Sequence, residues 1–219
     1  MNVLSPREAY RLWAPTYAAE TAISFLDEQL AGALSPPLRG LRLLDAGCGV
    51  GRRLNRAGAS PAVGIDLSFE MLSAGRAETV AAADICALPF AAGQFDLIWC
   101  RLVLGHLPDA DAAYSEMERV CAPGGHLFVT DFHADAVAVG HQRSFRDSNG
   151  VVHIVEHHMH DADAHKKAAE LAGFELVEQQ DGIIDEPVRS FYERSGRAVA
   201  YEKDKGLSVV AAFLFQRSA

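Results

Sequence analysis

The apolar positions of this chain follow two alternating patterns from residue 41 onward. Strand-length runs that are apolar at most positions are LRLLDA (41–46), PAVGID (61–66), FDLIWC (95–100) and HLFVTDF (126–132). Such runs are typical of buried parallel strands, because both faces of each strand are covered. Between them, residues 68–77 and 109–122 carry apolar side chains at helical spacing. Strands that alternate with helices predict βαβ units and a parallel sheet.

The pattern changes after residue 132. Residues 143–161 form two strand-like arms around Ser148-Asn149-Gly150, which predicts a β-hairpin. A helix is predicted over residues 161–174, because aspartates stand where they can cap its start and Gly173 stands where it can end it.

The last two predicted strands are FELVEQQ (174–180) and LSVVAAFLF (207–215), with a helix near residues 188–200 between them. We therefore expect an α/β, doubly wound, Rossmann-like sheet of about seven strands. Most strands should be parallel and the last one antiparallel, with the β-hairpin as an insertion. At 219 residues the chain should form one domain. Its parts are a helical segment (1–38) that ends at Pro36-Pro37, a core (39–135), and the hairpin with the C-terminal strands (136–219).

Composition narrows the classes of function. The net charge of −9 disfavours a nucleic-acid partner, because phosphate contacts need a clustered basic face. No apolar run approaches the roughly 18 residues of a membrane span, and the N-terminus has no secretory pattern. The cysteines lie far apart without a CxxC pair, which is typical of reduced thiols in a cytosolic protein. We expect a cytoplasmic monomer or homodimer without a membrane span or a metal.

The stretch LRLLDAGCGVG (41–51) carries the first functional signal. A strand that runs through glycines into a helix lets a ligand approach the backbone. The dinucleotide fingerprint is GxGxxG, whereas the spacing here is GxGxG, at Gly47, Gly49 and Gly51. Asp45 precedes this loop, and its carboxylate would repel a diphosphate but suit an ammonium group. The loop therefore indicates a ligand with a cation and little negative charge.

The stretch VGIDLS carries the second signal. It ends the second predicted strand with Asp66, nineteen residues after Gly47. An acid at this place can accept hydrogen bonds from both hydroxyls of a ribose, so the ligand is expected to contain a nucleoside. The alternative for Asp66 is to cap the next helix, a role for which Ser68 is better placed.

Several motifs in order now give a resemblance. LLDAGCGVG, GIDLSFEML, ADICALPF, FDLIWC and APGGHLFVTD resemble the motifs of class I S-adenosylmethionine-dependent methyltransferases, over residues 41–132. The resemblance is closest to the small-molecule branch that includes the ubiquinone, menaquinone and biotin-pathway methyltransferases. S-adenosyl-L-methionine has an ammonium, a sulfonium and a ribose but no phosphate, so it has the chemistry that Asp45 and Asp66 favour.

The resemblance implies a set of cofactor-binding residues. It places the glycines against the methionine part, Asp45 at the amino end, Asp66 at the ribose, Leu67 and Asp84 at the adenine, and two residues after the fourth strand near the methyl group. The full set is Asp45, Gly47, Gly49, Asp66, Leu67, Asp84, Ile85, Cys100 and Arg101. Ile85 can also be a simple core residue, and the neighbouring Arg52 can either bind the cofactor carboxylate or merely begin a helix.

The N-terminal stretch AYRLWAPTYAAE resembles a segment that folds over the active site in related enzymes. Tyr10, Trp13 and Tyr17 match that segment in type and are expected to contact the substrate, whereas Ala18 replaces an expected aspartate. The alternative is an amphipathic helix docked on the sheet.

The acceptor is expected beyond the carboxyl ends of the strands. His106 and His133 are the candidate general bases there, with Asp131 and His157 as substrate contacts. A structural hydrogen bond is an equal alternative for His106. The run HIVEHHMHD could place His158 and His160 on one face of a strand, but zinc usually needs three or four converging ligands, so no metal is predicted.

The sequence therefore predicts a methyltransferase that uses S-adenosyl-L-methionine on a small molecule, with O- or carboxyl-methylation slightly favoured over C-methylation. Methyl transfer from a sulfonium needs positioning rather than a diagnostic catalytic triad. Two alternatives remain: an NAD(P)-dependent oxidoreductase, and a catalytically inactive cofactor-binding partner protein.

Overall fold

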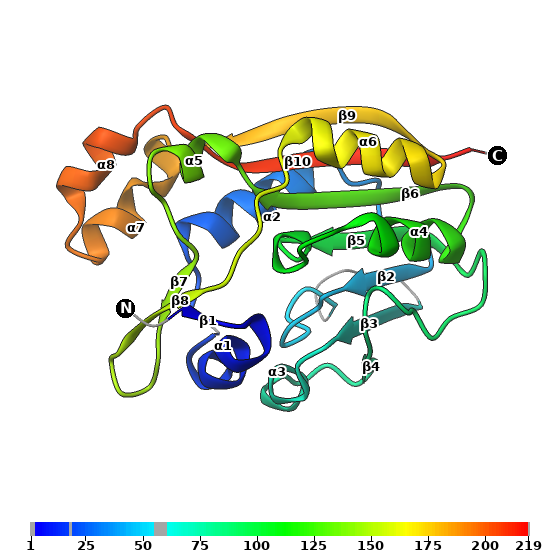
Figure 1. The fold of residues 1–219 in the computed structure, drawn as a ribbon, viewed down its shortest axis with the longest axis horizontal. Coiled ribbons are helices and arrows are strands. Elements are labelled where there is room, and N and C mark those ends of the chain that lie inside the picture. Colours follow the sequence, from blue (N-terminus) through cyan, green and yellow to red (C-terminus); the bar gives the residue numbers. More distant parts are fainter. Residues whose placement is uncertain (1–2, 18, 55–60, 219) are drawn as a thin grey trace.

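The computed structural model describes residues 3–17, 19–54 and 61–218. Its centre is a seven-stranded sheet (Figure 1), whose spatial order is β4 (Val80–Ala82), β3 (Ala62–Asp66), β2 (Leu43–Ala46), β5 (Phe95–Arg101), β6 (Cys121–Phe132), β10 (Ser208–Arg217) and β9 (Phe174–Ile183). β10 runs antiparallel to both of its neighbours, whereas the pairs from β4 to β6 are parallel. The predicted doubly wound sheet with its antiparallel last strand is confirmed.

Helices cover both faces of this sheet (Figure 1). One face packs against α4 (Asp111–Val120) and α6 (Ala162–Ala172), through a core that includes Tyr114 and Met117. The other face packs against α2 (Ala22–Leu34), η4 (Glu186–Val188), α7 (Arg189–Arg194) and α8 (Ala198–Asp204). The sheet therefore has a core on each side, which explains why its central strands are apolar at consecutive positions.

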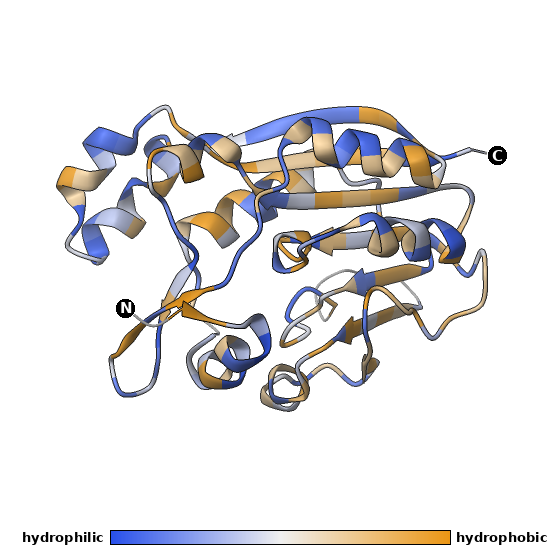
Figure 2. Ribbon diagram, in the orientation of Figure 1, coloured by the Kyte–Doolittle hydropathy of each residue, from blue (hydrophilic) through white to orange (hydrophobic). Residues whose placement is uncertain are grey.

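The outer strand β9 differs from the central strands, because most of its residues are exposed. Figure 2 shows it largely in the hydrophilic colour, while β5, β6 and β10 are mainly apolar. Polar side chains on an edge strand discourage pairing with another chain.

Two local features depart from the predicted elements. The short strand β4 was not among the predicted runs, because only three residues pair there. The helix predicted near residues 188–200 is divided into α7 and α8, and Gly196 between them has a φ of 70° that a continuing helix does not allow. The predicted helix over residues 161–174 is present as α6, with Asp161 as its N-cap and Gly173 as its C-cap.

A second, three-stranded sheet lies beside the main one. It joins β1 (Val3–Leu4), β8 (Val152–Val155) and β7 (Ser144–Arg146), and the predicted hairpin is confirmed in β7 and β8. The prediction of a strand up to residue 161 is wrong, because β8 ends at Val155. His158 and His160 therefore do not lie in a strand, and the expectation that they share one face of a strand is wrong.

The N-terminal helix α1 (Pro6–Trp13) packs on this small sheet through Ala9, Phe145 and Val155. Ser5 caps it with a capping box, in which Ser5 Oγ accepts from Glu8 N. α1 therefore docks on the inserted hairpin, not on the main sheet as the alternative for this segment had it. None of the helices in the described parts of the chain is long and apolar enough to cross a membrane.

Candidate active site

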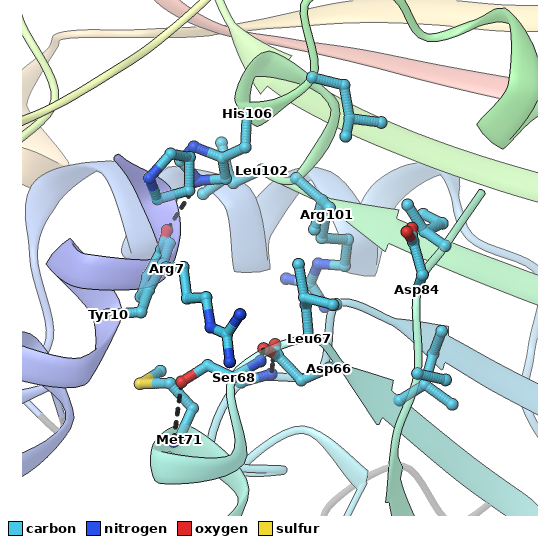
Figure 3. A pocket seen from close by; sticks show the side chains of 18 of the residues that line it. Arg7, Tyr10, Asp66, Leu67, Ser68, Met71, Asp84, Arg101, Leu102 and His106 are labelled. Atoms are coloured by element: carbon cyan, nitrogen blue, oxygen red, sulfur yellow. Dashed lines mark hydrogen bonds between the residues drawn. The ribbon is translucent and has the colours of Figure 1, made fainter. Parts of the chain in front are cut away.

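A cavity of about 280 Å³ opens at the carboxyl ends of β2, β3, β4 and β5 (Figure 3). α1 and Tyr17, which follows η1 (Ala14–Thr16), close it on the other side. The lining residues are Pro6, Arg7, Tyr10, Tyr17, Gly47, Gly49, Arg53, Ile65, Asp66, Leu67, Ser68, Met71, Ala83, Asp84, Ile85, Arg101, Leu102, Val103, His106 and Leu107. The cavity is thus where the doubly wound topology predicts a ligand.

The glycine loop forms one part of the wall with bare backbone. Gly47 and Gly49 have φ values of 85° and 57°, a region that side chains rarely allow. A Cβ atom on Gly47 would lie 2.2 Å from Cγ2 of Val103, so the space beside the loop depends on glycine. The amide N–H of Gly47 donates to the carbonyl of Ile65 at 2.8 Å, which ties the loop to β3.

Asp66 stands at the end of β3, on the cavity wall. Its two oxygens accept hydrogen bonds from the amide N–H groups of Gly49 and Ser68, both at 2.8 Å. Burial raises the pKa of this carboxyl, although the two hydrogen bonds oppose the shift. The competing capping role falls to Ser68, whose hydroxyl accepts from the amide of Met71 at the start of α3 (Phe69–Ala74). Asp66 is therefore left facing the cavity.

Three further predicted residues line the same side. Leu67 is 63% exposed although it is a large apolar residue, and it stands at the rim of the cavity. Asp84 and Ile85 line it from the loop after β4. Ile85 also belongs to the main core, so both predicted roles apply to it. An exposed leucine beside a cavity is a surface that a flat ligand can cover.

Asp45, predicted to hold the amino end of the cofactor directly or through water, does not line the cavity. Its side chain is fully buried, and within the described chain neither of its oxygens has a hydrogen-bond partner. Burial raises its pKa, although Arg53 opposes the shift from 3.8 Å away. Arg53 itself lines the cavity. The sequence argument missed it by considering its neighbour Arg52, and its position just after the glycine loop was the available signal.

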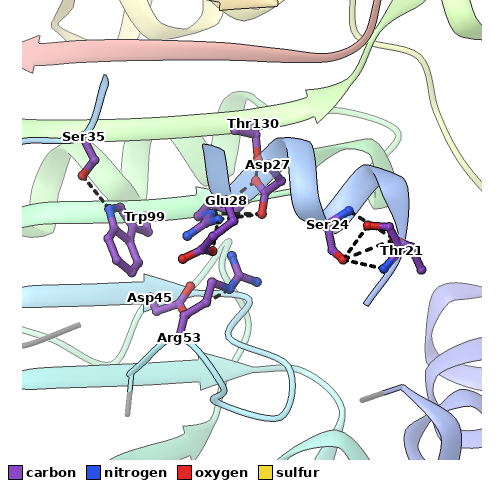
Figure 4. A network of polar contacts seen from close by, with 10 residues as sticks. Thr21, Ser24, Asp27, Glu28, Ser35, Asp45, Arg53, Trp99 and Thr130 are labelled. Carbon is purple, nitrogen blue, oxygen red and sulfur yellow. Dashed lines mark hydrogen bonds and ion pairs between the residues drawn. The ribbon is translucent and has the colours of Figure 1, made fainter. Parts of the chain in front are cut away.

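Arg101 lines the cavity, but its guanidinium is engaged in a buried network (Figure 4). It contacts Asp27 at 2.8 Å and Glu28 at 2.7 Å, both on α2. Thr130 also donates to Asp27, at 2.6 Å. Burial alone would raise the pKa of Asp27, but Arg101, the charge of Arg53 and the hydrogen bond from Thr130 outweigh it and hold the pKa below its ordinary value. Arg101 thus anchors α2 to the end of β5.

Cys100 is placed differently from the prediction. Its side chain is fully buried in the core on the α4 side and is not on the cavity wall. Successive residues of a strand point to opposite faces, so Arg101 and Cys100 could not both reach one ligand from within β5.

Tyr10 and His106 meet at the far end of the cavity (Figure 3). The Tyr10 hydroxyl lies 2.8 Å from Nε2 of His106, which belongs to η3 (Leu104–His106). Nη1 of Arg143 lies 2.6 Å from the same nitrogen, and Nη2 donates to the carbonyl of Leu102 at 2.9 Å. Burial and the charge of Arg143 lower the pKa of His106 to about 2. This arrangement favours the structural alternative for His106 over the general base.

The remaining predicted residues do not line the cavity. Trp13 stacks on Phe145, with ring centroids 4.8 Å apart, and thereby fixes α1 on the hairpin. His133 caps α5 (Ala134–Ala138), because its Nδ1 accepts from the amide of Asp135. His133 thus stands at the start of α5, away from the cavity wall on which a base for the acceptor would have to lie.

Asp131 and His157 form a buried cluster behind η3. Asp131 Oδ1 lies 3.6 Å from His157 Nε2, and Oδ2 lies 3.6 Å from His165 Nε2. Gly105 makes room for His157, since a Cβ atom there would lie 2.2 Å from Nε2. The amide of His158 donates to the carbonyl of Gly105 at 2.7 Å, so this segment supports η3 from behind. Within the described residues, no group of histidines, cysteines and acids is arranged to hold a metal.

Comparison with known proteins supplies independent findings. Residues 44–129 match a protein family described as "Methyltransferase domain". The chain is 35% identical over 130 residues to a malonyl-[acyl-carrier protein] O-methyltransferase of Enterobacter lignolyticus, over 57% of this chain and 52% of that protein. It is 32% identical over 150 residues to a ubiquinone biosynthesis O-methyltransferase of Ralstonia nicotianae, over 63% of this chain and 62% of the relative. The chain thus spans about half to three-fifths of the length of these relatives.

The fold has close counterparts among solved structures. An S-adenosylmethionine-dependent methyltransferase from Mesorhizobium loti superposes with a TM-score of 0.67, over 88% of this chain and 98% of that chain, at 23% identity. At this identity the likeness concerns the fold. The family match over residues 44–129, the ordered motifs and the sheet order agree, and together they support the resemblance to class I methyltransferases. The cofactor of this class is S-adenosyl-L-methionine.

Proposed function

We propose that this protein transfers a methyl group from S-adenosyl-L-methionine to a small-molecule acceptor, with O- or carboxyl-methylation favoured over C-methylation. The observation that carries the proposal is the cavity, in which the glycine loop and Asp66 face Tyr10 and His106 from remote parts of the chain. The relatives named as O-methyltransferases support oxygen as the accepting atom. We also infer a cytoplasmic location and no nucleic-acid partner, from the free cysteines and the net charge of −9.

The nucleoside part of the cofactor fits the edge formed by β3 and β4. Asp66 would accept from the ribose hydroxyls, and Asp84 would meet the adenine amino group. Leu67 and Ile85 would cover the ring faces, which explains the exposure of Leu67. In this role the exposed leucine becomes buried against the ligand.

The amino-acid part of the cofactor fits the loop after β2. A buried carboxylate without hydrogen-bond partners, such as Asp45, suits an ammonium group that reaches it directly or through water. Arg53, on the cavity wall nearby, would pair with the cofactor carboxylate. The two residues thus offer opposite charges to a zwitterion.

Bound there, S-adenosyl-L-methionine supplies a methyl group already activated by its sulfonium. The work left to this chain is to position the acceptor and to exclude water. Tyr10 and Tyr17 would do so from the N-terminal segment, which Trp13 and Phe145 hold in place. The role of Ala18 lies outside the described residues. His106 would orient Tyr10 rather than remove a proton.

Binding and transfer can be tested separately. Calorimetry should detect binding of S-adenosyl-L-methionine but not of NADH; the reverse result would favour the oxidoreductase alternative. Transfer of label from [methyl-³H]S-adenosyl-L-methionine to a bacterial metabolite extract should follow. Binding without any transfer would favour the inactive partner protein.

A further inference from the structure

Arg143, at the start of the inserted hairpin, contacts the acceptor end from outside the cavity. Its backbone carbonyl accepts from the amide of Val155 at 2.9 Å, so the hairpin fixes the place from which its side chain extends. Nη1 lies 2.6 Å from Nε2 of His106, and Nη2 donates to the carbonyl of Leu102 at 2.9 Å. His106 and Leu102 line the cavity, whereas Arg143 does not. Arg143 can therefore affect a ligand only through the residues that it contacts.

The guanidinium of Arg143 is held at two points, which fixes its direction. It is a planar group with several N–H donors in a rigid fork and no acceptor. Because Nη2 is anchored at the carbonyl of Leu102, Nη1 is directed at the imidazole of His106. Leu102 also has an anchor of its own, since its amide donates to the carbonyl of Thr130 at 2.8 Å. Loss of the Arg143 side chain would therefore leave the backbone at Leu102 attached to β6.

This contact decides which nitrogen of His106 carries the proton. Burial and the charge of Arg143 lower the pKa of His106 to about 2, so the ring is neutral. A neutral imidazole has one N–H and one nitrogen with a free lone pair. Nε2 faces a guanidinium N–H, which can donate but not accept. The lone pair must therefore lie on Nε2 and the ring proton on Nδ1.

The Tyr10 hydroxyl lies 2.8 Å from the same nitrogen and competes for its lone pair. Burial raises the pKa of Tyr10, so the hydroxyl keeps its proton. One lone pair accepts fully from only one donor, and a hydrogen bond from a charged group is the stronger one. The Arg143 contact is also the shorter of the two.

The proton of the Tyr10 hydroxyl is thus left without its nearest acceptor. Tyr10 lines the cavity, and its ring is held by stacking on Trp13, with centroids 5.7 Å apart. Figure 3 shows Tyr10 and His106 facing each other across this end of the cavity. A hydroxyl proton can rotate about its C–O bond to suit a partner. The Tyr10 O–H can therefore turn toward a ligand in the cavity.

We propose that Arg143 is a positioning residue for methyl transfer: it occupies the lone pair of His106 and so leaves the Tyr10 O–H free to orient the methyl acceptor. This inference rests on the proposed function and adds a residue that acts from outside the cavity. Arg143 touches neither the cofactor nor the acceptor, and Tyr10 keeps its proton throughout. Without Arg143, the Tyr10 hydroxyl should turn back to Nε2 of His106.

The first test measures the tautomer of His106 and needs no turnover. The ring nitrogens of ¹⁵N-labelled histidine are observed by NMR in protein saturated with S-adenosylhomocysteine, and His106 is assigned by comparison with His106→Gln. Nδ1 should carry the proton and Nε2 should be unprotonated. A protonated Nε2 would overturn the proposal, because Arg143 could not donate to it. Methyl transfer as the proposed function would be unaffected by that result.

The second test measures the rate at which label passes from [methyl-³H]S-adenosyl-L-methionine to a bacterial metabolite extract. Arg143→Met keeps a long side chain without donors. It should lower the rate at saturating cofactor about tenfold, the scale of one lost hydrogen bond. The KM for the cofactor should stay unchanged, because the cofactor end is intact. An unchanged rate would overturn the proposal, and absence of transfer by a wild type that binds the cofactor would overturn the proposed function and this role with it.

A double variant separates positioning from a general structural effect. Tyr10→Phe combined with Arg143→Met should be no slower than Tyr10→Phe alone, because Arg143 acts through the Tyr10 hydroxyl. If the two losses multiply instead, Arg143 does not act through Tyr10 and the proposal is overturned.

The matched control is Arg146→Met. Arg146 is an exposed arginine of the same hairpin that donates to the carbonyl of Gly150 and does not line the cavity. This variant should transfer label at the wild-type rate, and a tenfold loss here would overturn the specific role of Arg143. Unchanged binding of S-adenosylhomocysteine shows that each variant is folded. If Arg143→Met is not folded, the tautomer of His106 in the wild type decides the proposal.

Discussion

The two ends of the cavity are built in different ways. The cofactor end consists of loops that follow adjacent parallel strands, and Asp66 and the glycine loop lie within 20 residues of each other. The acceptor end joins segments that are remote in sequence: Tyr10 and His106 are 96 residues apart, and Arg143 is another 37 away. The first end follows from a local motif, whereas the second depends on how α1 and the hairpin dock. Acceptor preference can therefore change while the cofactor site stays intact.

The two ends also differ in charge. Beside the cofactor end, Arg101 is neutralised by Asp27 within the protein. Behind the acceptor end, outside the cavity wall, Arg143 contacts an imidazole and a carbonyl instead. Breaking a buried ion pair leaves a buried charge without its partner, whereas the partners of Arg143 are neutral groups. Variants of the Arg101–Asp27 pair should therefore mainly lower stability, and variants of the acceptor end should mainly change ligand binding.

The largest effect is expected from Asp27→Ala, because it leaves the buried Arg101 guanidinium without its closest buried partner. The free energy of unfolding should fall by about 3–5 kcal/mol in urea denaturation, the scale for breaking a buried ion pair. Glu28→Ala is the matched control. Glu28 contacts the same guanidinium, but its side chain is 59% exposed, so the loss should stay below about 1 kcal/mol. Equal losses would contradict the role assigned to burial.

The next effect concerns cofactor affinity. Asp66→Ala should weaken binding of S-adenosyl-L-methionine by about 1.5–3 kcal/mol, or roughly 10–150-fold, in calorimetry. Glu70→Ala, an exposed acid on α3 outside the cavity wall, should leave the affinity unchanged. An unchanged dissociation constant for the Asp66 variant would show that the ribose assignment is wrong.

The buried cluster behind η3 predicts a pH effect. Burial would raise the pKa of Asp131, but the imidazoles of His157 and His165 outweigh it and hold the pKa below its ordinary value. A carboxyl whose pKa is lower in the folded state stabilises the fold above its unfolded pKa of about 4, and this stability is lost as the pH falls further. Asp131→Asn should cost about 1–3 kcal/mol at pH 7.

The same variant should lose less stability than the wild type when urea denaturation is repeated at pH 3.5. Asp147→Asn is the control, since Asp147 also has a lowered pKa, beside His153, but lies in the exposed hairpin turn. Parallel pH profiles for wild type and the Asp131 variant would refute the stabilising role of this cluster.

The smallest effect is expected from Tyr10→Phe. His106 Nε2 keeps Arg143 as its donor, and the ring still packs between Trp13 and Tyr17. The free energy of unfolding should therefore change by less than about 0.5 kcal/mol, measured in urea, because no buried acceptor loses its last donor. A loss above about 1.5 kcal/mol would show that the Tyr10 hydroxyl is needed for folding rather than left for a ligand.

The site residues predicted from the sequence were placed more accurately at the cofactor end of the cavity than at the acceptor end. Gly47, Gly49, Asp66, Leu67 and Asp84 are on the cavity wall, because strand ends in a parallel sheet converge at one edge. Cys100 is not, because strand alternation turns it into the core. The acceptor side was less predictable: His133 became a helix cap and Asp131 part of a buried cluster, and Arg143 carried no sequence signal.

The sequence by itself determined the parallel sheet, the resemblance to methyltransferases and the position of the glycine loop, because apolar runs, turn residues and ordered motifs act over short stretches of chain. Only the tertiary structure decided what lies opposite that loop. The docking of α1 on the hairpin and the contacts among Tyr10, His106 and Arg143 come from long-range packing, in which each contact depends on the positions of several elements at once. No local sequence pattern encodes these long-range contacts, so only the folded chain shows which residues form the acceptor end.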